Sequence, residues 1–252
     1  MVKVRIDSEK LKNILCYPEY SDECYYKRLK ELDELSVKYI LLEGEKVLFG
    51  NIHVLGKGYA SVVLKAETCD GDIVTLKVRR TDSRRKSMEN EATCLAIANT
   101  VNVGPSILGF TENILMYRFI EGQTLDTWFK GASKQNIIRR VIVDILGQCF
   151  RLDLAPLDHG ELSRPHKHVI VDKRNKPYII DFESASYMRK PTNLSSAVSF
   201  FFIRKNMISR VLRDVLGYDV NDVLESIRKY KRTYEAKYFL ALLRAAKLIY
   251  LK

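Results

Sequence analysis

The sequence lacks the long apolar run that a membrane-spanning helix needs. Such a helix takes about 18 or more predominantly apolar residues in a row, and the longest candidate, residues 197–203, is far shorter. A secretory signal is lacking as well, because charged residues such as Lys3, Asp7 and Glu9 interrupt the N-terminus. We therefore expect a cytoplasmic protein with no membrane partner.

Cysteine pairs at metal-ligand spacing are also lacking. The five cysteines are scattered and include no C-x-x-C pair, whereas a structural zinc site needs four closely grouped ligands. This pattern favours small buried thiols in a reducing compartment, and a disulfide of the kind found in hyperthermophile proteins is the alternative. The cysteines are Cys16, Cys24, Cys69, Cys94 and Cys149.

Acidic residues are too few to balance the basic ones. The chain has 42 lysines and arginines against 31 aspartates and glutamates, a formal net charge of +11. Such a surface favours a polyanionic partner such as RNA or a ribonucleoprotein, and a solvated basic surface without a partner is the alternative. Hydrophobic residues make up 46% of the chain, which is enough for a packed core.

Changes of pattern divide the chain into three segments: residues 1–45, 46–121 and 122–252. The first is mixed and polar, and apolar residues at helical spacing predict an amphipathic helix over 26–40. We expect this N-terminal helical extension to cover the sheet that follows, and binding of a partner is the alternative.

The middle segment predicts an antiparallel sheet with one inserted helix, because short β-branched runs alternate with turns and Asp70-Gly71 is a strong hairpin signal. The last segment is mainly helical, so the whole predicts an α+β fold. Strands are predicted over 47–49, 52–55, 61–65, 73–78, 107–110, 114–120, 168–171 and 177–181, and helices over 83–99, 136–152 and from 193 onward.

Two glycines, Gly56 and Gly58, lie between two predicted strands in the run Leu-Gly-Lys-Gly-Tyr-Ala-Ser-Val-Val. Glycines in such a hairpin let backbone N–H groups approach phosphate oxygens closely. A Rossmann site is excluded because a strand, and not a helix, follows. An ordinary β-turn is the alternative.

A lysine within an apolar strand is costly unless its ammonium group meets anions. Lys77 stands in such a strand, and a position on the solvent face of an edge strand is the alternative. A glutamate of the following helix can pair with Lys77 and hold it against phosphates. Glu91 is preferred over Glu89, because Leu95 one turn later places Glu91 near the apolar face.

Two further motifs lie in the last segment. Asp181 directly follows an apolar strand, so its carboxylate can leave the strand end and hold a hard divalent cation. The run His-Gly-Glu-Leu at 159–162 lies between the long helix and the strand pair.

Taken together, these motifs resemble the protein-kinase set over about residues 50–190. Residues 56–61 resemble the glycine-rich loop, 159–162 the catalytic loop and 181–183 the metal-binding D-F-G, while 116–122 resemble the hinge that meets adenine. The resemblance implies a bilobal fold, with an antiparallel β N-lobe and a compact helical C-lobe.

The H-G-x-L form and the absence of an A-P-E motif make the chain similar to small atypical kinases. These are the RIO family, the kinase subunit of the KEOPS tRNA-modification complex and, most similar, related archaeal predicted Ser/Thr kinases. All of them lack the long activation segment, and here the chain passes from Asp181 to Asn193 within about a dozen residues.

The resemblance implies binding of ATP and Mg²⁺ between the two lobes. Lys77, held by Glu91, is expected to contact the α- and β-phosphates, and Asp181 to hold Mg²⁺ across the β- and γ-phosphates. The residues implied in cofactor binding are Gly56, Lys57, Gly58, Ser61, Lys77, Glu91, Tyr117 and Phe119.

The chain departs from the kinase pattern at several positions. Glu161 replaces the catalytic aspartate, and a glutamate can still accept a hydroxyl proton. The metal-binding asparagine is missing, and His166 or His168 stands in its place, which suits Mn²⁺ better than Mg²⁺; a basic surface loop is the alternative. Ser61 replaces the third loop glycine and Glu183 the D-F-G glycine.

Three functions stay open. The first is transfer of phosphate from ATP to serine or threonine, on a protein substrate or on the chain itself, catalysed by Glu161, Lys77 and Asp181. The second is an ATPase-type switch in a ribosomal or tRNA-related assembly, which the RIO and KEOPS resemblances imply. The third is a nucleotide-binding pseudokinase scaffold, which the glutamate at 161 and the missing asparagine favour.

Overall fold

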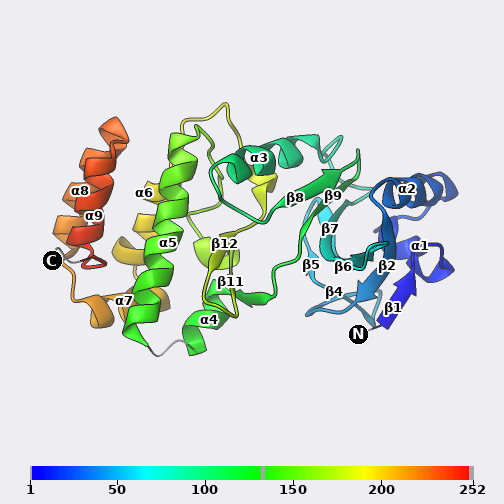
Figure 1. Cartoon of the computed structure of the whole chain (residues 1–252), viewed down its shortest axis with the longest axis horizontal. Helices are drawn as coiled ribbons and strands as arrows, with labels where there is room; N and C mark the ends of the chain where they lie inside the picture. Colours follow the sequence, from blue (N-terminus) through cyan, green and yellow to red (C-terminus); the bar gives the residue numbers. More distant parts are fainter. Residues whose placement is uncertain (1, 132–133, 250–252) are drawn as a thin grey trace. The chain divides into compact units, whose positions relative to one another are not determined.

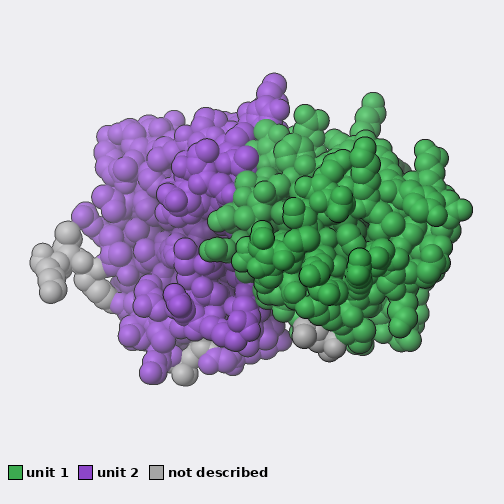
Figure 2. Space-filling model, turned by 45° about the vertical axis from the view of Figure 1, so that its right-hand side comes forward, with its two compact units in different colours: residues 1–93, 106–119 green, residues 94–105, 120–252 purple. Residues whose placement is uncertain are grey.

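The computed structural model describes residues 2–131 and 134–249, and it has the predicted α+β fold with an antiparallel sheet (Figure 1). The chain divides into two compact units (Figure 2). Unit 1 comprises Met1–Thr93 and Ser106–Phe119, and unit 2 comprises Cys94–Pro105 and Ile120–Lys252.

Within the described residues, unit 1 is built on a 7-stranded antiparallel sheet in the order β1-β2-β6-β7-β9-β8, with β5 paired to β6. Its strands are β1 (Val2–Arg5), β2 (Val37–Leu42), β5 (Gly56–Lys57), β6 (Ser61–Thr68), β7 (Ile73–Arg79), β8 (Ile107–Phe110) and β9 (Ile114–Arg118). A separate hairpin joins β3 (Lys46–Leu48) to β4 (Ile52–Val54). Gly71, with φ of +87°, lies in the turn between β6 and β7, which confirms the predicted hairpin.

The helix predicted over 26–40 is wrong at its C-terminal end. Helix α2 spans Asp22–Glu34 and is capped by the Ser21 hydroxyl, and Ser36, with φ of +55°, then leads the chain into β2. β2 pairs with β1 on one side and with β6 on the other, so residues 1–45 add two strands to the sheet. This pairing with distant strands outweighs the helical spacing of the local sequence.

The helix predicted over 83–99 begins later, because α3 spans Glu89–Thr100. The preceding residues form turns in which the Ser83 hydroxyl accepts a hydrogen bond from Arg85 N and the Arg79 guanidinium donates to Arg85 O at 3.0 Å. Serine side chains that bond nearby backbone groups compete with helix formation. The helix therefore begins at Glu89 and not at Ser83.

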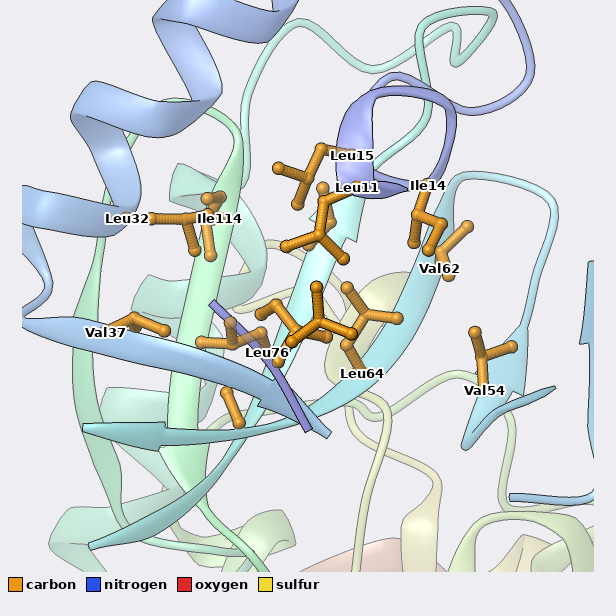
Figure 3. Packing of buried hydrophobic residues seen from close by; sticks show 14 of the residues in the cluster. Leu11, Ile14, Leu15, Leu32, Val37, Val54, Val62, Leu64, Leu76 and Ile114 are labelled. Carbon is orange, nitrogen blue, oxygen red and sulfur yellow. The ribbon is translucent and has the colours of Figure 1, made fainter. Parts of the chain in front are cut away.

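The core of unit 1 includes the start of the chain. The short helices η1 (Glu9–Leu11) and α1 (Lys12–Leu15) carry Leu11, Ile14 and Leu15, which are fully buried. Figure 3 shows these side chains among buried residues of the sheet such as Leu64 and Leu76. Residues 9–15 are therefore part of the packed unit.

Cys16 and Cys24 form a disulfide, which corrects the expectation that all five cysteines are thiols. Cys16 ends α1 and Cys24 lies in the first turn of α2, with Cα atoms 6.1 Å apart, within the usual disulfide range. A spacing of eight residues matches no cysteine motif, so the sequence alone does not reveal this pairing. The remaining cysteines are free, with Cys69 exposed and Cys94 and Cys149 buried.

Unit 2 is mainly helical, as predicted. Its long helix α5 (Gln135–Leu154) buries a stripe at helical spacing and packs against α6 and β12. The other elements are β10 (Gly122–Thr124), α4 (Leu125–Gly131), η2 (Pro165–Lys167), β11 (Val169–Asp172), β12 (Pro177–Ile179), η3 (Phe182–Ser184), α6 (Asn193–Val198), the π-helix η4 (Ser199–Ile203), α7 (Met207–Leu216), α8 (Val220–Thr233) and α9 (Ala236–Ala245).

The tyrosines near the basic run 228–232 turn inward. The Tyr230 hydroxyl donates to Asp153 at 2.9 Å, and the Tyr234 hydroxyl donates to the carbonyl of Pro191 at 2.7 Å. They are therefore engaged in packing α8, while the basic side chains of the run are exposed.

Among the described residues, none of the helices combines the length and apolarity required to cross a membrane.

Candidate functional site

The glycine-rich turn lies in register with Lys77 in unit 1. Gly56 pairs with Val63 of β6, and Val63 pairs with Lys77 of β7, so the three residues form one cross-strand row. Side chains in one row of an antiparallel sheet project from the same face. At the turn itself, Gly58 N donates to Ser61 O at 2.9 Å, and Tyr59 is 97% exposed at the tip.

Lys77 is buried beside Glu91. Its Nζ lies 2.7 Å from Glu91 Oε1, with 5% and 6% of the two side chains exposed. The alternative of a lysine on the solvent face is therefore wrong, and Glu91 is the partner rather than the exposed Glu89. The ammonium group is held on the face that carries the glycine-rich row.

Tyr117 and Phe119 lie at the end of β9 and just beyond it. Tyr117 is paired with Thr75 of β7 and is half-buried. The Phe119 ring lies 4.4 Å from Lys65 Nζ. Contact of this stretch with adenine stays a prediction.

His159 is the buried anchor of the loop that carries Glu161 in unit 2. Its side chain is fully buried, and its Nε2 lies 3.0 Å from the carbonyl of Ile180. Because a carbonyl only accepts, Nε2 carries the proton and Nδ1 is free to accept from Glu161 N at 3.4 Å. The backbone N of His159 donates to Asn193 at 2.8 Å, which fixes the loop to α6.

Glu161 has a hydrogen-bond donor that the sequence did not identify. The Ser184 hydroxyl donates to Glu161 Oε1 at 3.1 Å. The adjacent Gly160 has φ of +85°, and a Cβ there would lie 2.7 Å from Ser184 O and 2.8 Å from the guanidinium of Arg189. Glycine is thus required for Glu161 to approach the segment after β12.

Asp181 leaves the end of β12 in an unusual backbone conformation. Its φ of 70° and ψ of 67° lie in the left-handed region, which non-glycine residues rarely adopt. Strain of this kind persists only where the surroundings enforce it, and it is concentrated at functional sites. The Asp181 side chain is 38% exposed, and its Oδ2 lies 3.4 Å from His168 Nδ1.

The two candidate histidines differ in their surroundings. His168 lies against Asp181, whereas the His166 ring stacks on Phe200 with centroids 5.0 Å apart. In residues 2–131 and 134–249, no group of three His, Cys, Asp or Glu side chains could hold a metal ion by itself. Mg²⁺ often takes only one or two carboxylates and completes its shell with substrate phosphates and water, so Asp181 still fits such an ion.

A buried network of hydrogen bonds supports the loop that carries Glu161. Asp153 accepts hydrogen bonds from Asn193 Nδ2 at 2.9 Å and from the Tyr230 hydroxyl at 2.9 Å, and burial raises its pKa to about 6. Asp158 accepts from Arg189 Nε at 3.1 Å. The sequence feature that could have indicated this network is the carboxylate of Asp153, which lies at the end of an apolar helix.

Acid should destabilise unit 2 through His159. Burial lowers the pKa of His159 from 6.5 to about 4. The unfolded chain therefore binds this proton below pH 6.5 while the folded chain does not, so stability is lost as pH falls from 6.5 toward 4. Moving from neutral pH to about pH 5 should cost roughly 2 kcal/mol through this group.

Urea denaturation followed by the fluorescence of Trp128, the single tryptophan, reports unit 2. His159→Gln keeps a donor for Ile180 O but cannot ionise, so this variant should lose less stability than the wild type between these pH values. Asp153, whose raised pKa increases stability as pH falls, is present in both proteins. Its contribution to the stability change is therefore removed when the two are compared. An equal loss in both proteins would contradict the assignment.

Part of this chain is similar in sequence to a known protein kinase. No family model matches the sequence. The chain is 27% identical over 180 residues to the leaf rust 10 disease-resistance locus receptor-like protein kinase-like 2.1 of Arabidopsis thaliana, which covers 67% of this chain and 28% of that protein. The chain is thus distantly similar to a receptor-like protein kinase.

Two other proteins match in part. An uncharacterized protein of Methanocaldococcus jannaschii is 26% identical over 117 residues, which covers 46% of this chain and 97% of that protein. The protein SUPPRESSOR OF NPR1-1 CONSTITUTIVE 4 of Arabidopsis thaliana is 26% identical over 204 residues, 75% of this chain and 18% of that protein. The chain therefore spans less than a third of either plant protein.

Proposed function

We propose that this chain is an ATP-dependent phosphotransferase of the protein-kinase type, related to the RIO and KEOPS atypical kinases. The observation that carries the proposal is the buried Lys77–Glu91 ion pair on the face of the glycine-rich row. A buried ion pair contributes little net stability compared with apolar residues. Its presence beside a glycine turn is therefore best explained by a need to hold an ammonium group for phosphates.

In this proposal the residues take the roles that the resemblance to protein kinases implies for them. Lys77 binds the α- and β-phosphates, Asp181 is the Mg²⁺ or Mn²⁺ ligand and His168 lies beside it. The ion, when bound, supplies charge neutralisation at the β- and γ-phosphates. As the hydroxyl oxygen bonds to the γ-phosphorus, the bond from that phosphorus to the β–γ bridging oxygen breaks and ADP leaves. Glu161 accepts the proton of the hydroxyl, and Ser184 orients its carboxylate.

The basic charge favours an acidic or nucleic-acid partner through unit 2, as an ATPase-type switch in a ribonucleoprotein assembly would need. Unit 2 has 24 lysines and arginines and 14 aspartates and glutamates, a difference of +10, and unit 1 has 18 and 17, a difference of +1. The second candidate function is therefore ATP hydrolysis coupled to such a partner.

Incubation with γ-labelled ATP and Mg²⁺ or Mn²⁺ tests the proposal. We expect label on serine or threonine of an added protein or of the chain itself, lost in both Asp181→Ala and Glu161→Ala. Free phosphate without labelled protein, again lost in both variants, would favour the ATPase switch. Binding of ATP without either product would leave a nucleotide-binding scaffold and contradict the phosphotransferase.

A further inference from the structure

The segment that precedes α2 contacts the glycine-rich turn through the ring of Tyr17. Lys57 Nζ of the turn lies 4.8 Å from the centre of this ring, and the guanidinium carbon of Arg80 lies 5.0 Å from it. Phe49 meets the ring edge-on at 5.3 Å. Cations at these distances over an aromatic ring are attracted to it.

Arg80 connects this ring to the backbone of the turn. Its Nη1 donates to Gly58 O at 2.9 Å, and its backbone N donates to Ala60 O at 2.8 Å. Asp82 accepts from the other side of the guanidinium, at 2.8 Å from Nε and 2.6 Å from Nη2. The guanidinium is therefore held in one orientation while it bonds to the turn.

Tyr17 is itself fixed on both sides. Its carbonyl accepts from Thr81 N at 2.9 Å, and Glu19 N donates to the Thr81 hydroxyl at 3.2 Å. The preceding residue, Cys16, is fully buried and is joined by the disulfide to Cys24 in α2. The disulfide thus closes the loop that carries Tyr17.

We propose that Tyr17, Lys57 and Arg80 form a clamp that positions the glycine-rich turn for ATP, and that the Cys16–Cys24 disulfide makes ATP affinity depend on redox state. The proposal rests on the proposed function of the turn. A turn held near its bound conformation loses less entropy when it orders around phosphates, so binding is tighter. Tyr17 and Arg80 are positioning residues, since they act through the turn.

The redox step needs a dithiol as the reductant. It passes two electrons and two protons to the disulfide, whose S–S bond breaks to give the Cys16 and Cys24 thiols, and it becomes a disulfide itself. The loop that carries Tyr17 is then no longer closed by a covalent bond. The clamp loosens, and ATP affinity should fall.

A matched pair of variants tests the clamp. Tyr17→Leu removes the ring, whereas Tyr17→Phe keeps it. For the oxidised protein, the Kd for Mg²⁺·ATP should rise about tenfold in Tyr17→Leu and stay near the wild-type value in Tyr17→Phe. The turnover at saturating ATP should be unchanged in both, because the clamp acts on binding; a merely structural role would not separate Kd from turnover in this way.

Dithiothreitol tests the redox dependence. It should raise the wild-type Kd several-fold and leave the Kd of the double variant Cys16→Ser/Cys24→Ser, already weak, unchanged. If the oxidised wild type binds ATP but neither Tyr17→Leu nor dithiothreitol alters the Kd, the clamp is overturned and the proposed function stands. If the oxidised wild type does not bind ATP, the proposed function and the clamp both fail.

Discussion

Replacing Lys77 alone with methionine should lower the free energy of unfolding of unit 1 by about 3–5 kcal/mol. The change leaves the Glu91 carboxylate charged at a position where 6% of the side chain is exposed, without the ammonium group 2.7 Å away. A buried charge that loses the attraction of a paired ammonium group is less well compensated for its removal from water. Glu91→Leu should have an effect of similar size for the same reason.

The double variant Lys77→Met/Glu91→Leu should be more stable than either single variant, because it removes both charges together. Urea denaturation followed by far-ultraviolet circular dichroism is the measurement, since Trp128 lies in unit 2 and does not report unit 1. Lys3→Met is the control, because the Lys3–Glu67 pair is 43% and 22% exposed and should contribute no more than about 1 kcal/mol. Simple addition of the two single losses would contradict a coupled buried pair.

Glu161→Gln should lower the rate of phosphate transfer by about 10²–10⁴-fold with little change in KM for ATP. The amide has nearly the shape of the carboxylate but cannot accept the hydroxyl proton. Steady-state kinetics at saturating acceptor separate this loss of turnover from a loss of binding. Wild-type turnover in this variant would show that Glu161 is not the base.

Ser184→Ala provides the matched test of orientation. It removes the hydroxyl 3.1 Å from Glu161 Oε1 and should slow transfer by roughly tenfold, far less than loss of the carboxylate. Ser184→Thr, which keeps the hydroxyl, should restore the rate.

Several strands of unit 1 can be predicted from short stretches of sequence alone. The runs that form β3, β4, β6 and β7 are β-branched and separated by turn residues, and the structure has strands in these places. β1 and β2 were missed because their evidence is not local: Val2 pairs with Leu42, 40 residues away along the chain. The Cys16–Cys24 disulfide was missed because its cysteines meet only when α1 and α2 pack.

For the candidate site too, the sequence predicts what depends on local spacing and misses what depends on tertiary packing. Glu91 was identified because helical spacing alone places it near the apolar face, where Lys77 lies. Ser184 follows Glu161 by 23 residues, and no periodicity links the two. The surroundings of His168 and His166 likewise depend on tertiary packing, which brings one to Asp181 and the other to Phe200.

Calorimetric titration of ATP into the oxidised protein, with and without Mg²⁺, measures directly whether this chain binds ATP and the metal ion. Asp181→Asn is the matched variant, because asparagine accepts the left-handed backbone of this position and should leave the fold intact. We expect saturable binding by the wild type that tightens with Mg²⁺, and binding by the variant that no longer responds to the ion. No saturable binding of ATP by the folded wild type, with either Mg²⁺ or Mn²⁺, would contradict the proposed function.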